Sequence, residues 1–187
     1  MWLAQQPFDT RVYAELTRGE KMTTVDPTAF KAAAGSFGTG VTVVTSNQNG
    51  QVYGMTVSAF ASLSIEPMQI IVSLRAGSLL QSMISASNNF AVNILREDQK
   101  EVAAFFATSG REPSAGEFPG LDCSTAISGA PIIGGSLAHF DCTLATVHDG
   151  GDHVIIVGDV VEAVAQDGAP LLYFKGVYRG IRDLAGL

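Results

Sequence analysis

The chain has 187 residues, of which 47% are hydrophobic and 16% charged, and its formal net charge is −7. This composition excludes extended disorder, and the length suits one domain that buries roughly 70% of the unfolded chain's surface. A nucleic-acid-binding protein is not expected, because the acidic chain shows no basic stripe.

Cysteine and histidine usage argues against metal and disulfide chemistry. Cys123 and Cys142 lack CxxC spacing and are too few for a disulfide framework, so they are read as thiols of a reducing cytoplasm. The three histidines, His139, His148 and His153, lack an HExxH pattern, and no zinc site is expected. No apolar run reaches about 18 residues, so no membrane span is expected.

In chain order, residues 1–25 are expected to form a leader, extended or partly helical, before one domain over 26–187. The expected elements are a helix from Asp26-Pro27 to about Ala34, strands over 40–46, 52–64, 68–74 and 90–95, helices over 78–87 and 97–108, a loop over 109–120, two long strands around 149–152, and short strands after 170.

Local residue chemistry supports several of these boundaries. Asp26 can cap a helix that has proline at its first position, and Ser78 can cap another. Asn49-Gly50 is the best hairpin signal in the chain. In "HDGGDHVIIVGDV" (148–160), a glycine turn precedes four aliphatic residues, which puts His153 where a strand begins.

Many strands joined mostly by hairpins, with short helices outside, predict a mostly β fold: a closed β-barrel with α elements. The βαβαβ alternation of a parallel nucleotide-binding sheet is missing, and so is a GxGxxG after the first strand. The low charge favours an oligomer that covers apolar surface.

The segment "YGMTVSAFASLS" (53–64) contains four hydroxyl side chains at even spacing: Thr56, Ser58, Ser62 and Ser64. Even spacing puts them on one face of an extended strand, where they could meet the edge of a flat, hydrogen-bonding heterocycle. A solvated strand face is the competing interpretation.

Three other places offer ligand-binding groups. Arg75 ends a strand just before the helix that begins at Ser78, and such a helix end can cradle phosphate, although a surface arginine before a capped helix fits equally. Asn93 lies in an apolar strand and needs a partner, either backbone or ligand. His153 is at an accessible sheet rim or is only a turn neighbour.

Five stretches together resemble the flavin reductase-like family, over roughly residues 27–180 and in the family's order. They are "FGTGVTVVTS", "YGMTVSAFASLSIEP", "SLRAGSLLQSM", "FAVNILREDQKEVAAFFA" and "GGDHVIIVGDV". The resemblance implies an FMN-binding split barrel flanked by short helices, a homodimer, and hydride transfer from NADH, with NADPH possible, to FMN or FAD. The reduced flavin would serve a separate flavin-dependent monooxygenase.

The resemblance also implies roles for individual residues. The 54–62 strand would line the flavin ring, and Ser73, Leu74, Arg75 and Ser78 would hold its ribityl phosphate. His153 would orient the nicotinamide. The remaining expected cofactor-binding residues are Gly54, Thr56, Val57, Ser58, Ala59, Ser62, Asn93, Asp152 and Tyr178.

Two departures from the family pattern affect this segment. Met68 follows Pro67 where a second proline is common, and Ala59 replaces a frequent second hydroxyl. The alternatives are a flavoprotein that keeps its flavin and acts as an oxidase or reductase on another substrate, a flavin store or sensor without turnover, and a barrel without a ligand. The Gly151-Asp152-His153 turn favours the reductase, because a store has no need to dock a nicotinamide.

Overall fold

The structure is a computed structural model that describes residues 25–184. The expected leader, apart from its last residue, lies outside the described residues. The chain divides into two compact units, residues 1–34 and 35–187. Helix α2 (Pro27–Gly35) begins as predicted, and the Asp26 carboxylate accepts hydrogen bonds from the backbone N–H groups of Thr28 and Ala29 at 3.2 and 3.3 Å. Within 25–184, no helix has the length and apolar character needed to cross a bilayer.

The larger unit is built mostly from antiparallel strands. The strands are β1 (Thr39–Gly40), β2 (Thr42–Gln48), β3 (Gln51–Val57), β4 (Phe60–Ile65), β5 (Met68–Arg75), β6 (Asn89–Ile94), β7 (Ser114–Ala115), β8 (Cys123–Thr125), β9 (Pro131–Ile133), β10 (Ala138–Gly150), β11 (His153–Ala165), β12 (Leu172–Phe174) and β13 (Val177–Arg179). The helices are α3 (Leu79–Ser87), η1 (Glu97–Gln99), α4 (Lys100–Ala107) and η2 (Ile181–Leu184).

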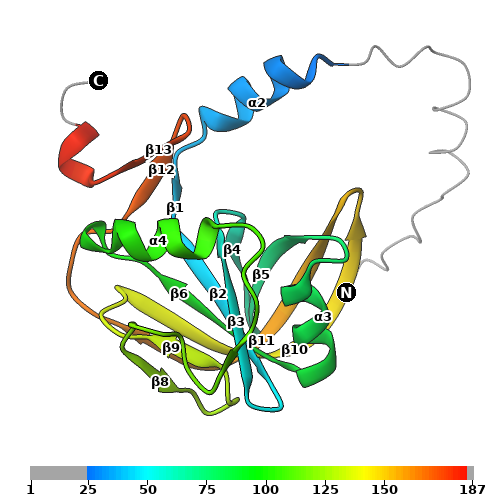
Figure 1. Cartoon of the computed structure of the whole chain (residues 1–187). Helices are drawn as coiled ribbons and strands as arrows, with labels where there is room; N and C mark the ends of the chain where they lie inside the picture. Colours follow the sequence, from blue (N-terminus) through cyan, green and yellow to red (C-terminus); the bar gives the residue numbers. More distant parts are fainter. Residues whose placement is uncertain (1–24, 185–187) are drawn as a thin grey trace, which may run out of the picture. The chain divides into compact units, whose positions relative to one another are not determined.

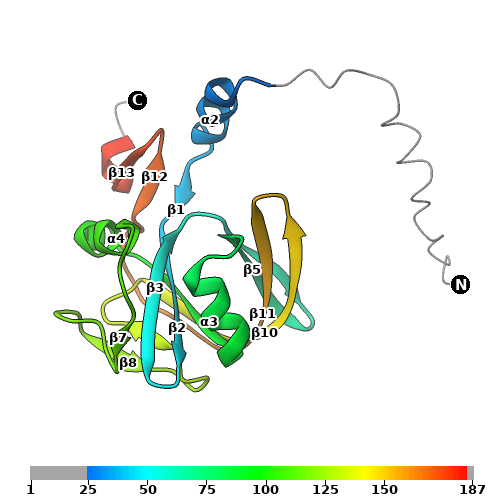
Figure 2. The ribbon, with the colours of Figure 1, turned by 45° about the vertical axis from the view of Figure 1, so that its right-hand side comes forward.

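Eight strands form one curled sheet in the order β4-β5-β11-β10-β6-β2-β3-β7, which Figures 1 and 2 show from two sides. Within residues 25–184, the end strands β4 and β7 do not pair with each other, so the barrel is split and not closed as the strand pattern alone predicted. Two small sheets, β1-β12-β13 and β8-β9, complete the unit.

Both predicted hairpin turns are present. Asn49 and Gly50 have φ values of 53° and 81°, the left-handed conformation that a tight turn requires, and they join β2 to β3. Gly151 has a φ of 78° and joins β10 to β11, the pair of 13-residue strands whose tip projects from the body in Figure 1. The helix predicted from Ser78 is α3, and the Ser78 hydroxyl accepts from the N–H of Gln81.

The predicted strand over 52–64 is two strands. The chain turns at Ser58–Ala59, where the N–H of Phe60 donates to the carbonyl of Ser58, and the N–H of Ser73 donates to the carbonyl of Ala59 at 3.0 Å. A register shift follows between Ser62 and Ser64. The four hydroxyl side chains therefore do not share one strand face, because the break and the shift change which side each residue faces.

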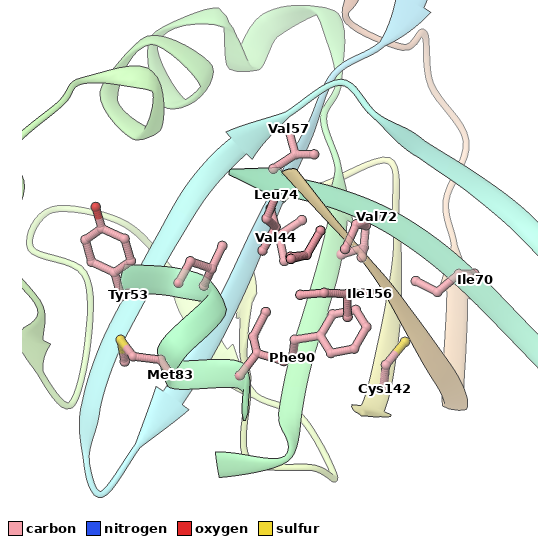
Figure 3. Packing of buried hydrophobic residues seen from close by; sticks show 14 residues of the cluster. Val44, Tyr53, Val57, Ile70, Val72, Leu74, Met83, Phe90, Cys142 and Ile156 are labelled. Carbon is pink, nitrogen blue, oxygen red and sulfur yellow. The ribbon is translucent and has the colours of Figure 1, made fainter. Parts of the chain in front are cut away.

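The barrel interior is filled by side chains. Figure 3 shows this cluster, in which Phe90, Ile156 and Val72 are fully buried among aliphatic neighbours from β2, β5 and α3. Gly158, part of the most distinctive sequence stretch, lies against the ring of Phe90: a Cβ built on it would be 2.8 Å from Cε1 and closer still to Cζ. This glycine therefore serves packing and not ligand binding.

Candidate functional site

A cavity of about 790 Å³ lies on the outer side of the sheet, where β4, β5 and β11 pass the segment that leads into β2. Its volume is in the range of small-molecule sites. Its walls are mostly apolar and several are small. The lining residues are Phe37, Gly38, Thr39, Gly40, Thr42, Ser58, Ala59, Phe60, Ala61, Ile71, Val72, Ser73, Ile94 and Ile155.

Strand register brings His153 and Arg75 to the same sheet face as this first cavity. Ile155 pairs with Ser73, and both line the cavity. His153 pairs with Arg75, two residues further along each strand. Because side chains two apart on a strand point to the same face, His153 and Arg75 extend the cavity wall toward the hairpin tip. His153 is half-buried and Arg75 is exposed.

Asp152 fixes the orientation of the His153 ring. The distance from Nδ1 of His153 to Oδ1 of Asp152 is 2.8 Å. This hydrogen bond, together with the charge of His153, lowers the pKa of Asp152. The carboxylate is therefore the acceptor and Nδ1–H the donor, so in the neutral ring Nε2 is left as an acceptor. The carbonyl of Asp152 also accepts from the N–H of Ala76 at 3.0 Å, which ties the hairpin tip to the end of β5.

A second, more polar cavity of about 430 Å³ lies between β3, the end of α4 and the small sheet β1-β12-β13. It is lined by Val41, Tyr53, Met55, Thr56, Ser58, Ser78, Leu79, Phe106, Ala107, Thr108, Ser109, Gly110, Tyr173 and Tyr178. Ser58, at the break between β3 and β4, lines both cavities. The Tyr173 and Tyr178 rings are 5.4 Å apart, and burial is the main cause that raises the pKa of Tyr178.

The N-terminus of α3 opens toward the second cavity through Ser78 and Leu79. Ser78 is in an extended conformation and caps the helix, while the N–H of Gly77 donates to the Gln81 side chain at 2.6 Å. A helix start carries partial positive charge, and Arg75 lies three residues before it in the chain. The N-terminus of α3 therefore gives the second cavity a positively polarised end.

The structure brings together most of the residues predicted from the sequence. Those that line a cavity are Thr56, Ser58, Ala59, Ser73, Ser78 and Tyr178. Arg75, Asp152 and His153 follow along the sheet face at the hairpin tip. Thr56 has a second task, because its hydroxyl donates to the carbonyl of Ala103 on α4 at 2.7 Å.

Asn93, which the resemblance places near the flavin, is in the interior and lines neither cavity. It is fully buried, its side-chain N–H group donates to the carbonyl of Val43 at 3.1 Å, and its side-chain oxygen accepts from the N–H of Ile133 at 2.9 Å. Backbone groups are thus among its partners, and its side-chain N–H also donates to the Thr45 hydroxyl at 3.3 Å. Asn93 joins β6 to β2 and β9.

Four other predicted residues also lie outside the two cavities. Val57 and Leu74 are core side chains, because they alternate with residues that face outward. A Cβ on Gly54 would be 3.0 Å from the ring of Phe106, so this glycine allows α4 to pack on β3. Ser62 is exposed and pairs with the core residue Ile70, which puts it on the face of β4 opposite Ala61.

Sequence reasoning missed the segments that complete both cavities. Phe37 to Gly40 form one wall of the first cavity, and Ala107 to Gly110 with Tyr173 form one wall of the second. Thr39 adds a buried hydroxyl with no hydrogen-bond partner among the described residues. Glycines around a lone threonine and an unpatterned loop carry no local signal for ligand binding. Their role depends on which strands they meet in the fold.

The two cavities, which share Ser58 as a lining residue, suit a flat, elongated ligand. The first offers apolar walls with exposed backbone, and the second offers hydroxyl groups, tyrosines and a helix N-terminus. Such linings can stack and orient flat rings, which is what hydride transfer between two heterocycles requires.

Residues 34–182 match the model of the flavin reductase like domain. The chain is 41% identical over 160 residues to the reductase subunit HsaB of a flavin-dependent monooxygenase from Mycobacterium tuberculosis, covering 84% of this chain and 83% of that protein. It is 40% identical over 150 residues to the FMN reductase (NADH) SmoA of Agrobacterium fabrum, covering 80% and 83%. The NADH:FAD oxidoreductase SgcE6 of Streptomyces globisporus, solved with NAD and FAD fragments, superposes with a TM-score of 0.76 at 32% identity, over 83% of this chain and 94% of that one.

Proposed function

The chain belongs to the flavin reductase-like family, and from this premise we propose that it transfers a hydride from NADH to FMN or FAD and supplies the reduced flavin to a separate monooxygenase. Relatives that carry the names reductase subunit, FMN reductase (NADH) and NADH-dependent FAD reductase support this reaction. The observation that carries the proposal is the cavity wall shared by Ser73, Ile155 and, beyond them, Arg75 and His153.

The residues present fit a flavin. The first cavity has apolar walls and the small side chains of Ala59 and Ala61, which let a flat ring lie against the sheet. Because Ser58 lines both cavities, the proposed path of the ribityl chain runs past Ser58 toward Ser78 in the second cavity. There the helix N-terminus favours a phosphate group. The flavin ring supplies the hydride-accepting chemistry when bound, and the protein supplies position.

His153 is the proposed orienting residue for the nicotinamide. With Nδ1–H engaged by Asp152, Nε2 can accept a hydrogen bond from the carboxamide N–H of a nicotinamide that lies against the flavin. Such a bond fixes the ring at reacting distance without transferring a proton. Arg75 pairs with His153 across the strands and adds a cation near the phosphates of the dinucleotide.

A homodimer is proposed from exposed apolar side chains at the turn between β4 and β5. Ile65 is 86% exposed, Met68 63% and Leu63 51%, and Ile65 pairs with Met68 in the register. Such a patch favours burial against a second copy. Light scattering is expected to report a dimer for the wild type and a monomer for I65D/M68D. A monomeric wild type would overturn the proposed homodimer.

A cytoplasmic location is proposed from the free thiols of Cys123 and Cys142.

The deciding experiment is turnover. Purified protein is mixed with NADH or NADPH and increasing FMN or FAD, and loss of nicotinamide absorbance is followed in air. A rate that rises with free flavin is expected, with NADH preferred. Tight flavin binding without nicotinamide oxidation would instead assign the protein to the flavin-storing class. Turnover of another substrate by a retained flavin would assign it to the oxidase class.

The role of His153 has its own test. H153A is expected to raise the KM for NADH about tenfold, equivalent to about 1.4 kcal/mol, while the Kd for flavin stays within twofold. H139A is the matched control, because His139 is at the opposite end of the same strand pair, beside Glu162. Loss of flavin affinity in H153A with an unchanged KM for NADH contradicts the assigned role.

A further inference from the structure

The wall of the second cavity formed by residues 107–110 begins at the last residue of α4, and residues 108–110 belong to no strand or helix. A segment without backbone hydrogen bonds of a helix or strand keeps its conformation only through contacts with other elements. The residue that follows, Arg111, belongs to the loop predicted over 109–120, which has no periodic pattern, and the reaction proposed above assigns it no role. Arg111 does not itself line either cavity.

The Arg111 guanidinium joins the end of α4 to β3. Nη2 donates to the carbonyl of Gly54 on β3 and, at 3.2 Å, to the carbonyl of Phe106 on α4. Nε donates to the carbonyl of Thr108 at 3.3 Å, inside the wall segment. One planar group thus fixes three backbone carbonyls from a strand, a helix end and the cavity wall.

Aromatic rings surround the same guanidinium. Its Cζ lies 5.0 Å from the ring centroids of Tyr53, Phe105 and Phe106. Two of these rings, Tyr53 and Phe106, also line the second cavity. Arginine suits this position better than lysine, because a flat guanidinium stacks on rings while its fork reaches several carbonyls.

The charge of Arg111 is not neutralised locally. None of the ion pairs found among the described residues includes it, and its partners are carbonyl dipoles and ring faces. The positive charge of Arg111 therefore adds to the partial positive charge at the α3 N-terminus. Both lie beside the second cavity, which has few other charged neighbours. The combination favours an anionic group in the second cavity.

We propose that Arg111 is a positioning residue that holds residues 107–110 as the wall of the second cavity and thereby sets the affinity for the phosphate-bearing part of the flavin. The inference rests on the proposed function, because it takes flavin as the occupant. Gly54 and Thr56 act in the same arrangement. Gly54 leaves room for the Phe106 ring, and Thr56 ties β3 to the carbonyl of Ala103.

The test compares FMN with riboflavin, which has the same ring and ribityl chain but lacks the phosphate. Kd values for both are measured by flavin fluorescence for the wild type, R111M and R111K, together with the Tm. The matched control is R96M, because Arg96 is also half-buried but pairs with Asp98 away from both cavities.

R111M is expected to weaken FMN binding about tenfold and riboflavin binding less than threefold, with the KM for NADH at saturating flavin unchanged. R111K keeps the charge but not the fork, and is expected to recover part of the FMN affinity. R96M is expected to bind both flavins as the wild type does. This pattern cannot arise from loss of stability alone, which would weaken binding of both flavins equally.

FMN affinity within twofold of the wild type in R111M, or an equal loss for both flavins, overturns the proposal. If R111M fails to fold, R111K carries the test; if both fail, Arg111 is a core residue and the proposal is wrong. The binding measurements need no turnover, so a wild type that binds flavin but does not oxidise NADH overturns the proposed function and leaves this inference testable.

Discussion

Gly158→Ala should destabilise the protein although it adds a single methyl group. The new Cβ would be 2.8 Å from Cε1 of Phe90 and 3.1 Å from Cβ of Cys142, and Phe90 and Cys142 are both fully buried. Overpacking of this kind costs about 1–3 kcal/mol. A rigid aromatic ring at this distance puts the cost at the upper end.

An opposing effect reduces that cost. Replacing glycine restricts the unfolded chain and stabilises the folded state by about 0.4–1 kcal/mol where the backbone is ordinary, as it is at Gly158. The overpacking is larger, so the expected net loss is about 2 kcal/mol in the free energy of unfolding, measured by urea denaturation.

Phe90→Leu provides the internal check, because leucine lacks the two ring atoms that the new methyl group would meet. In that background Gly158→Ala should cost less than about 1 kcal/mol, a coupling within the range of contacting pairs. Gly40→Ala is the matched control, since its Cβ would have no neighbour within 4 Å. A Gly158→Ala protein within about 0.5 kcal/mol of the wild type would refute this account of the packing.

Two further predictions concern buried polar groups. Asn93→Leu should lower the free energy of unfolding by about 3 kcal/mol, because the N–H of Ile133 loses its hydrogen-bond partner. The flavin Kd should stay within twofold of the wild type. A large loss of flavin affinity at unchanged stability would instead support Asn93 as a flavin-binding residue. Burial raises the pKa of Cys142 to about 12 from 9.0, so the folded chain keeps this proton while the unfolded chain loses it, and stability should fall between pH 9 and 12 by on the order of 4 kcal/mol. Urea titrations across that pH range should show that the free energy of unfolding falls less steeply with pH in Cys142→Ala than in the wild type. Equal pH dependence in the two proteins would contradict the raised pKa of Cys142.

Features set by neighbouring residues were predictable from the sequence. The Asn49-Gly50 turn needs only left-handed backbone at two positions, and the start of α3 needs only the Ser78 side chain. The turn at residues 149–152 likewise placed His153 at a strand start beside the cavity wall.

Features set by distant partners were not predictable. The break after Val57 depends on the bond between Ala59 and Ser73, and the interior position of Asn93 depends on Ile133, which lies 40 residues away. Arg111 has a partner 57 residues away at Gly54. Residue type and spacing contain no information about contacts between residues so far apart in the chain, so the sequence could not show that Asn93 and Gly54 make packing and hydrogen-bonding contacts in the interior.

The position of the first cavity on the outer face of the sheet has a consequence for how this molecule can change. The barrel interior is packed with its own side chains, so a ligand enters and leaves without opening the core. Substitutions at Ala59, Ala61 or Ile155 alter the shape offered to the ligand at little cost in folding free energy. One scaffold can therefore diverge toward different flavins and different partner enzymes while its barrel stays the same. Selection can also tune the exchange rate of reduced flavin separately from the stability of the folded protein.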